Sequence, residues 1–289
     1  MRKVFNITVL LSTMAILTNC GMTNGGGIKS FNLFTIQNDK ELGKEVAAEI
    51  DGNRQEYPVL DSAKYPVPYR YIYDIRNKIL NSGNVKHKDD FAWRIRIIQD
   101  DETKNAFCTP GGYIYVYTGL IKYLDSEEQL AGVIAHEIGH ADLRHSTRQM
   151  TKSYGVDVML SIIAGDQALI RDLTASIIGL KFSRTHETEA DKASVTFLCG
   201  TDYDAAGGAK FFEKIEAEGG AAVPEWLSTH PSPDNRIEYF YNEATAQVQI
   251  IVLKIFITKQ QHKAAQVKRR IKVVTNSSLD RYHSPSLEF

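Results

Sequence analysis

The sequence predicts an α+β domain that is mostly helical and contains two short strands. Apolar residues recur at the spacing of an amphipathic helix in most of the chain. Two short segments, rich in aromatic and β-branched residues, alternate instead as strands do. The 289 residues are 43% hydrophobic and 24% charged, which excludes a disordered or collagen-like chain. The net charge of -1 gives no reason to expect nucleic acid as a partner.

The first two helices are expected at residues 41–54 and 69–80. Each places its apolar side chains largely on one face. Pro66 and Pro68 indicate a loop between the two helices, because proline lacks the backbone N–H that a helix interior uses. The polar, glycine-containing stretch 81–84 then ends the second helix.

Two strands are expected in the next part of the chain. Residues 91–98 alternate around Trp93 and Ile95, and residues 113–117 (YIYVY) are aromatic and β-branched. Residues 105–112 between them are rich in turn formers and predict a loop.

The second half of the domain is expected to be helical. Ser126 is a good N-cap, and Gln129 three residues later predicts a capping box for a helix that runs to about Leu143. Residues 153–180 are apolar but interrupted by charges, which favours a helical hairpin over a membrane span. Two further helices are expected, at residues 184–198 and 205–217.

The N-terminus has the three parts of an export signal. A positive start is followed by an apolar run at residues 4–17 and then by Cys20, which resembles a bacterial lipoprotein signal. We therefore expect residues 1–19 to be removed and Cys20 to carry the lipid; ordinary secretion and an uncleaved anchor are the alternatives. Gly21 after the cysteine favours the outer membrane, with the protein facing the periplasm. Residues 20–35 predict a flexible tether.

The C-terminal residues 246–289 differ from the rest in charge. They hold eight Lys and Arg residues against two acids, and their apolar run at 249–257 is far shorter than a membrane span. This basic segment, of uncertain structure, is either a surface for anionic lipid or a partner, or a solvated edge strand and tail.

The sequence His136-Glu137-Ile138-Gly139-His140 carries the chemistry. Residues four apart lie on one face of a helix, so the two imidazoles can bind one tetrahedral Zn²⁺. Glu137 lies one residue around the helix, where its carboxylate can act as a general base on water and return the proton to a leaving amine. The competing interpretation is a buried helix with two hydrogen-bonded histidines.

A catalytic zinc site needs a third protein ligand. His145 does not fit the pattern HExxHxxGxxH, because Leu143 stands at its glycine position and Ser146 at its final histidine. Glu187, which opens the helix predicted at 184–198, is the better candidate.

The residues around Glu187 can support such a site. Asp191 lies one helical turn further on and can accept the remaining N–H of a ligand imidazole, which we assign to His136. Glu189 points away on this geometry and is expected to be solvated or paired with an arginine. His186 is expected on the helix surface.

These motifs together resemble the M48-type zinc metallopeptidases, in particular the periplasmic lipoprotein members (BepA- and Loi-like). The resemblance covers residues 32–245. It rests on three motifs in the family's order: Asn105-Ala106-Phe107 with Pro110-Gly111-Gly112, the HEIGH sequence of residues 136–140, and Glu187-x-x-Ala190-Asp191.

The resemblance implies a zincin fold of gluzincin type, mostly helical, with a small antiparallel sheet and the HExxH helix at its active site. It implies one Zn²⁺ per chain, with His136, His140 and Glu187 as ligands and Glu137 as general base. The domains expected are a lipoprotein signal at 1–19, a tether at 20–35, the peptidase domain at 36–245 and the basic tail at 246–289.

The resemblance also assigns two substrate-facing segments. Gly112, Tyr113, Ile114 and Tyr115 look like the family's edge strand, which can pair with an extended substrate. The segment from His230 to Arg236 resembles a loop over the active site. There His230 or Arg236 can donate to the oxyanion of the reaction, or His230 can occupy the open position on the metal in a closed state; hydrogen bonds that fix the loop are the alternative.

Cys108 and Cys199 are both expected near the site. In an oxidising periplasm two leftover cysteines often pair, so either a disulfide or two buried thiols is expected.

The sequence therefore predicts a zinc endopeptidase of the bacterial cell envelope, and the resemblance implies that its substrates are unfolded or misassembled envelope proteins. The alternative is a chaperone-like assembly factor with a closed protease site, working with the outer-membrane assembly machinery. A purely structural zinc protein would need four protein ligands, and Glu137 argues against it.

Overall fold

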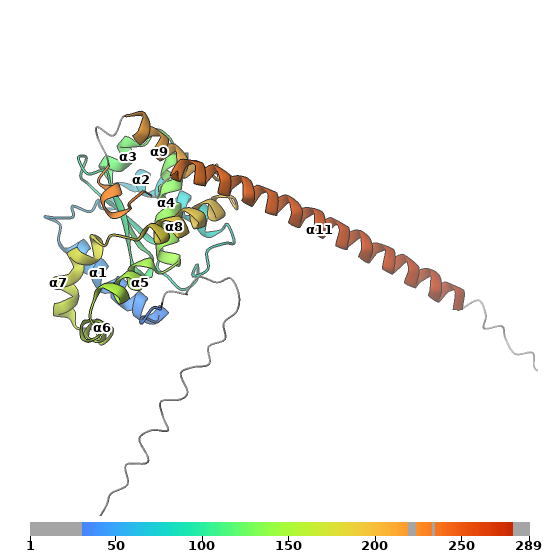
Figure 1. Cartoon of the computed structure of the whole chain (residues 1–289), viewed down its shortest axis with the longest axis horizontal. Helices are drawn as coiled ribbons and strands as arrows, with labels where there is room; N and C mark the ends of the chain where they lie inside the picture. Colours follow the sequence, from blue (N-terminus) through green and yellow to red (C-terminus); the bar gives the residue numbers. More distant parts are fainter. Residues whose placement is uncertain (1–30, 219–223, 233–234, 280–289) are drawn as a thin grey trace, which may run out of the picture. The chain divides into compact units, whose positions relative to one another are not determined.

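The computed structural model describes residues 31–218, 224–232 and 235–279 (Figure 1). The chain divides at Phe31, and Asn32–Phe289 forms the unit described below. Its strands are β1 (Arg94–Ile98), β2 (Ala106–Thr109) and β3 (Tyr113–Tyr117), with the short 3-10 helix η1 (Pro110–Gly112) between the last two. Its α-helices are α1 (Ile36–Gly52), α2 (Pro66–Leu80), α3 (Thr118–Tyr123), α4 (Glu127–Asp142), α5 (His145–Ser153), α6 (Val156–Ile163), α7 (Gln167–Ile178), α8 (Arg184–Leu198), α9 (Gly207–Ala217), α10 (Trp226–Thr229) and α11 (Arg236–Leu279).

The three strands form one mixed sheet in the order β1-β3-β2. β2 turns back into β3 through η1 and pairs with it antiparallel, and β3 returns alongside β1 in parallel. The predicted fold class, mostly helical with a small sheet, is confirmed, but the sheet is mixed rather than antiparallel. The hairpin reverses the chain once after β2, so β3 runs in the direction of β1.

β2 was not predicted, because residues 105–112 look like a loop. All four of its residues are buried, so the strand shows no alternation of polar and apolar side chains. The turn into β3 depends on Gly112, which has φ +80; a Cβ there would lie 3.1 Å from the backbone nitrogen of Trp93. Only glycine fits such a position easily.

The predicted helices are present, with earlier starts in the first two. α1 begins at Ile36 because Thr35 forms a capping box with Asn38. α2 takes in both of its prolines, since Pro66 stands at the first turn, where no backbone N–H is needed. Ser126 caps α4 by accepting from the backbone N–H of Gln129.

α4 is the central helix of the unit. It packs against β2, α2, α8 and α9, and nearly all its residues beyond the first turn are buried (Figure 1). Two glycines permit this close packing: a Cβ at Gly132 would lie 2.6 Å from the backbone of α9, and one at Gly139 would lie 3.1 Å from the carbonyl oxygen of Ala190 in α8. The helix that carries HExxH is therefore enclosed on all sides.

The apolar segment 153–180 forms the expected helical hairpin. α6 and α7 pack on α1 and bury Met159, Ile162, Ile170 and Ile177 in a second hydrophobic cluster (Figure 1). Within the described ranges, every helix is too short or too polar to cross a membrane.

The C-terminal segment is a helix, and the expected edge strand there is wrong. α11 runs unbroken to Leu279; its first turns contact α8 and α9 and bury Phe240. The run 249–257 continues this helix, because no described strand lies beside it to pair with. Its large apolar side chains are exposed: Ile250, Ile251, Val252, Leu253, Ile255, Phe256 and Ile257.

The predicted N-terminal segments are largely outside the described residues. The signal at 1–19, Cys20 and the tether up to residue 30 fall there. The end of the expected tether, however, is folded: Phe34 is buried, and the Asn32 side chain donates to Thr147 at 3.0 Å.

Candidate metal centre

Three side chains from two helices converge inside the protein. α4 presents His136 and His140, and α8 presents Glu187 from its first turn; all three are buried. The two Nε2 atoms lie 2.9 Å apart, and the Glu187 oxygens lie 3.5 Å from His136 Nε2 and 3.4 Å from His140 Nε2. Ligands of one tetrahedral ion with bonds of about 2.0–2.1 Å lie about 3.3 Å from one another. The arrangement fits one metal ion.

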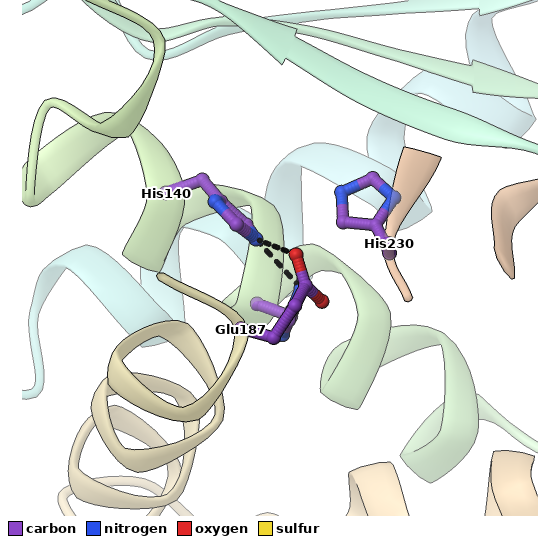
Figure 2. Close-up of side chains that lie close together, drawn as sticks. His140, Glu187 and His230 are labelled. Atoms are coloured by element: carbon purple, nitrogen blue, oxygen red, sulfur yellow. Dashed lines mark hydrogen bonds and ion pairs between the residues drawn. The ribbon is translucent and has the colours of Figure 1, made fainter. Parts of the chain in front are cut away.

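His230 stands on the fourth side of this cluster (Figure 2). Its ligand atom and those of the other three residues all lie within 4.8 Å of one another. The Nδ1 atom lies 3.1 Å from the carbonyl oxygen of Trp226, and the ring stacks on that indole at 4.4 Å. Thr229 Oγ1 also lies 2.9 Å from Nδ1. The Nε2 atom makes no hydrogen bond among the described residues and lies 3.4 Å from Glu137 Oε1.

Glu137 lies beside the cluster and is fully buried. The indole N–H of Trp226 donates to its Oε1 at 3.1 Å, and its Oε2 has no partner within the described ranges. Burial raises the pKa of this carboxyl to about 7, against the positive charge of His136, which lowers it. A carboxylate with a pKa near neutrality can both take up and release a proton.

The surroundings shift the pKa values of the two histidines in opposite directions. Burial disfavours the charged form of His136, but the Asp191 and Glu187 carboxylates outweigh it and raise the pKa to about 9. Burial, reinforced by the charge on His136, lowers the pKa of His140 well below its ordinary value.

Asp191 and Arg236 hold the carboxylate side of the cluster. Asp191 Oδ1 lies 2.9 Å from His136 Nδ1. The guanidinium of Arg236 donates to both Asp191 oxygens at 2.8 and 2.7 Å and to Glu187 Oε2 at 3.2 Å. Two buried carboxylates thus hold Arg236, while its Nη1 atom has no hydrogen-bond partner among the described residues, so its role as a donor to the oxyanion stays a prediction.

The family follows from a comparison with known proteins. The model of peptidase family M48 matches residues 66–244. The chain belongs to this family.

Its relatives include proteases of mitochondria and of bacteria. The mitochondrial metalloendopeptidase OMA1 of Arabidopsis thaliana is 34% identical over 154 residues, which is 52% of this chain and 31% of that protein. The beta-barrel assembly-enhancing protease of Escherichia coli is 27% identical over 243 residues, 78% of this chain and 48% of that protein. The chain therefore spans less than half the length of these two relatives.

The strand next to the site is β2, and the prediction that β3 is the edge strand is wrong. β3, with Gly112 before it and Tyr113, Ile114 and Tyr115 within it, lies between β1 and β2, so both its edges are paired. The Tyr117 N–H donates to the Asn105 carbonyl, and antiparallel pairs alternate, so the backbone groups of Ala106 and Cys108 face away from β3. Both residues are buried, and the Ala106 N–H donates to Asn105 Oδ1 at 2.8 Å, so the outer edge of β2 offers the two carbonyls and the Cys108 N–H.

Cys108 and Cys199 are free thiols. Burial raises the pKa of the Cys108 thiol well above its ordinary value, and the neighbouring negative charge of Glu137 adds to this shift. Cys199 caps the far end of α8, twelve residues and about 18 Å along the helix beyond Glu187. Cys108 therefore lies beside the site, as expected, whereas Cys199 lies well away from it, and the two thiols do not form a disulfide.

Three polar residues lie behind His140, and one of them, His186, differs from its predicted environment. His145 is fully buried, and its Nδ1 lies 2.9 Å from His140 Nδ1. His186, expected on the surface, is buried and stacks on His145 at 4.5 Å. Glu189 pairs with Arg148, as expected for an arginine partner, and also with His145. The hydrogen bond from His145 and the charge of Arg148 lower the pKa of Glu189 to about 2.

Sequence reasoning also missed Trp226, which contacts Glu137 and His230. A lone tryptophan carries no spacing signal that relates it to α4. Its neighbour in sequence, His230, was the available clue.

Replacing Arg236 by methionine is expected to destabilise the protein. The change leaves the buried carboxylates of Glu187 and Asp191 without their cation, and breaking such a pair costs about 3–5 kcal/mol. Urea denaturation of the metal-free full chain measures the loss. Arg171→Met is the matched control, because Arg171 is exposed on α7. Equal free energies of unfolding in the two variants would contradict the structural role of Arg236.

Proposed function

We propose that the chain is a zinc-dependent endopeptidase that hydrolyses unfolded or misassembled cell-envelope proteins. The observation that carries the proposal is the convergence of His136, His140 and Glu187 on one point, with Glu137 beside them. Two imidazoles and one carboxylate are a donor set typical of catalytic zinc, which keeps one position open for the reaction.

The chain's own residues then have distinct tasks. A bound Zn²⁺ supplies a Lewis acid that lowers the pKa of water and polarises a carbonyl. Glu137 takes the proton of the attacking water at its unpartnered Oε2 and returns it to the leaving amine. Trp226 orients this carboxylate by donating to its other oxygen. Asp191 and Arg236 keep the ligand carboxylate and His136 in place.

The free edge of β2 favours extended substrates. The Cys108 N–H and the carbonyls of Ala106 and Cys108 can pair with a peptide backbone, which is the same in every sequence; the Ala106 N–H is donated to Asn105 Oδ1. A folded protein cannot offer such a strand readily, whereas an unfolded segment can. This supports unfolded or misassembled chains as the substrate class.

Glu137→Gln is expected to abolish most cleavage of unfolded casein while zinc binding remains. Removing a general base costs about 100-fold or more, whereas the three ligands are untouched. Cleavage rate and zinc content per chain are measured together, and a chelator should inactivate the wild type reversibly. Glu127→Gln, the same change on the exposed start of α4, is the control. Full activity in Glu137→Gln would refute the proposed mechanism.

The position of His230 favours a second function, that of an assembly factor with a closed protease site. Its Nε2 faces the three ligands and can occupy the position that substrate needs. The E. coli relative is a beta-barrel assembly-enhancing protease by name, which supports a role with outer-membrane assembly machinery. In this proposal His230 leaves the cluster when substrate enters.

His230→Ala is accordingly expected to raise the rate of casein cleavage several-fold, because the competing ligand is removed. Zinc content should stay near that of the wild type. The exposed His262, changed to alanine in the same way, serves as control. A fall in the rate with zinc retained would show instead that His230 donates to the oxyanion.

We further propose attachment to the outer membrane, facing the periplasm, through a lipid on Cys20. The support is the order of charge, apolar run and cysteine in the sequence. Labelling cells with radioactive palmitate should mark the wild type but not Cys20→Ser, which should leave the membrane fraction. Label on the variant would refute the assignment.

A further inference from the structure

A second set of polar contacts lies behind His140, on the side away from the ligand cluster. α4 ends at Asp142, and two residues later the chain turns at Arg144, which has φ +60. Its guanidinium pairs with the buried Asp39 of α1 and donates to the Phe34 carbonyl at 2.6 Å. These contacts hold a backbone conformation that a non-glycine residue seldom adopts. As a result, His145 at the start of α5 faces back toward His140.

His145 connects His140 to a charged carboxylate. His140 Nδ1 lies 2.9 Å from His145 Nδ1, and His145 Nε2 lies 3.0 Å from Glu189 Oε2. Arg148, one turn along α5, donates to the same Glu189 oxygen at 2.8 Å. The four side chains of His140, His145, Glu189 and Arg148 therefore form a continuous series of hydrogen-bonding distances.

The carboxylate at the end of this series sets the directions of the hydrogen bonds. Glu189 accepts from Arg148 and, as a carboxylate, can only accept, so His145 donates to it from Nε2. The Nδ1 atom of a neutral His145 then accepts, and His140 donates to it from its own Nδ1. Each ring is left with a single tautomer, and it is the tautomer in which His140 Nε2 can bind a metal ion.

We infer that His145 and Glu189 position His140 for metal binding, as Asp191 and Arg236 do for His136. The inference rests on the proposed function only in requiring that His140 is a metal ligand. α8 supplies the carboxylate behind each histidine: Asp191 for His136 and Glu189 for His140, on either side of Ala190. Arginines from α5 and α11 hold these acids in turn. A carboxylate and an arginine thus hold each imidazole on its Nδ1 side, directly at His136 and through His145 at His140.

Two substitutions of His145 separate positioning from packing. His145→Gln keeps an acceptor for His140 and a donor for Glu189, whereas His145→Leu fills similar space with neither. We expect the leucine variant to lose about 10- to 100-fold in Co²⁺ affinity and to change the visible spectrum of bound Co²⁺. The glutamine variant should restore most of both. His186→Leu is the matched control, since His186 is buried in the same cluster and its nitrogens have no hydrogen-bond partner among the described residues.

The full chain is titrated with Co²⁺ against a competing chelator, and the melting temperature of each metal-free variant is recorded. Wild-type Co²⁺ affinity in His145→Leu, or equal losses of affinity in the leucine and glutamine variants, would overturn this inference but not the proposed function. A wild type that binds no metal would overturn the proposed function as well. If the leucine variant does not fold, Glu189→Ala replaces it, because Glu189 is partly exposed and is the last residue of the series His140–His145–Glu189. It should weaken Co²⁺ binding in the same direction, and unchanged binding would overturn the inference.

Discussion

The close approach of α4 and α8 is the constraint on which the site depends. Gly139 stands between the two histidines of HExxH, and any side chain there would press on the backbone of Ala190. Because the helices touch at this point, Glu187 reaches the space in front of both imidazoles. The glycine of the HEIGH sequence therefore serves the geometry of the metal centre, although it contributes no ligand.

Burial of so many ionisable groups requires that each be held by another. Glu187 and Asp191 are fully buried, and a carboxylate in such surroundings is costly unless it is paired. Arg236, itself buried, supplies one positive charge to both, and His136 supplies another. A dry, crowded cluster of this kind fixes distances closely, which suits metal binding, and it leaves Glu137 with a pKa near neutrality because water cannot stabilise its charge.

The segment around α10 closes the site from the other side. Trp226 donates to Glu137 and supports the ring of His230 by stacking, so one side chain holds both the proposed base and the fourth candidate ligand. The proposed general base Glu137 and His230 are thereby linked through one indole ring. Removal of His230 from the cluster would disturb the surroundings of Glu137 at the same time.

Local sequence determined those features whose reasons are local. Helical spacing, the Ser126 cap and the separation of His136 and His140 act over a few residues, and they located α4, α8 and the HExxH face correctly. Tertiary structure alone decided the rest. β2 is buried on both sides and gives no alternation, and only pairing shows that β3 is the central strand. The carboxylate partners of Arg236 and His145 lie more than forty residues away in the sequence. Whether residues 249–257 form a strand or a helix depended on whether another strand lay beside them. Such contacts depend on how the chain folds back on itself, which no short window of residues contains.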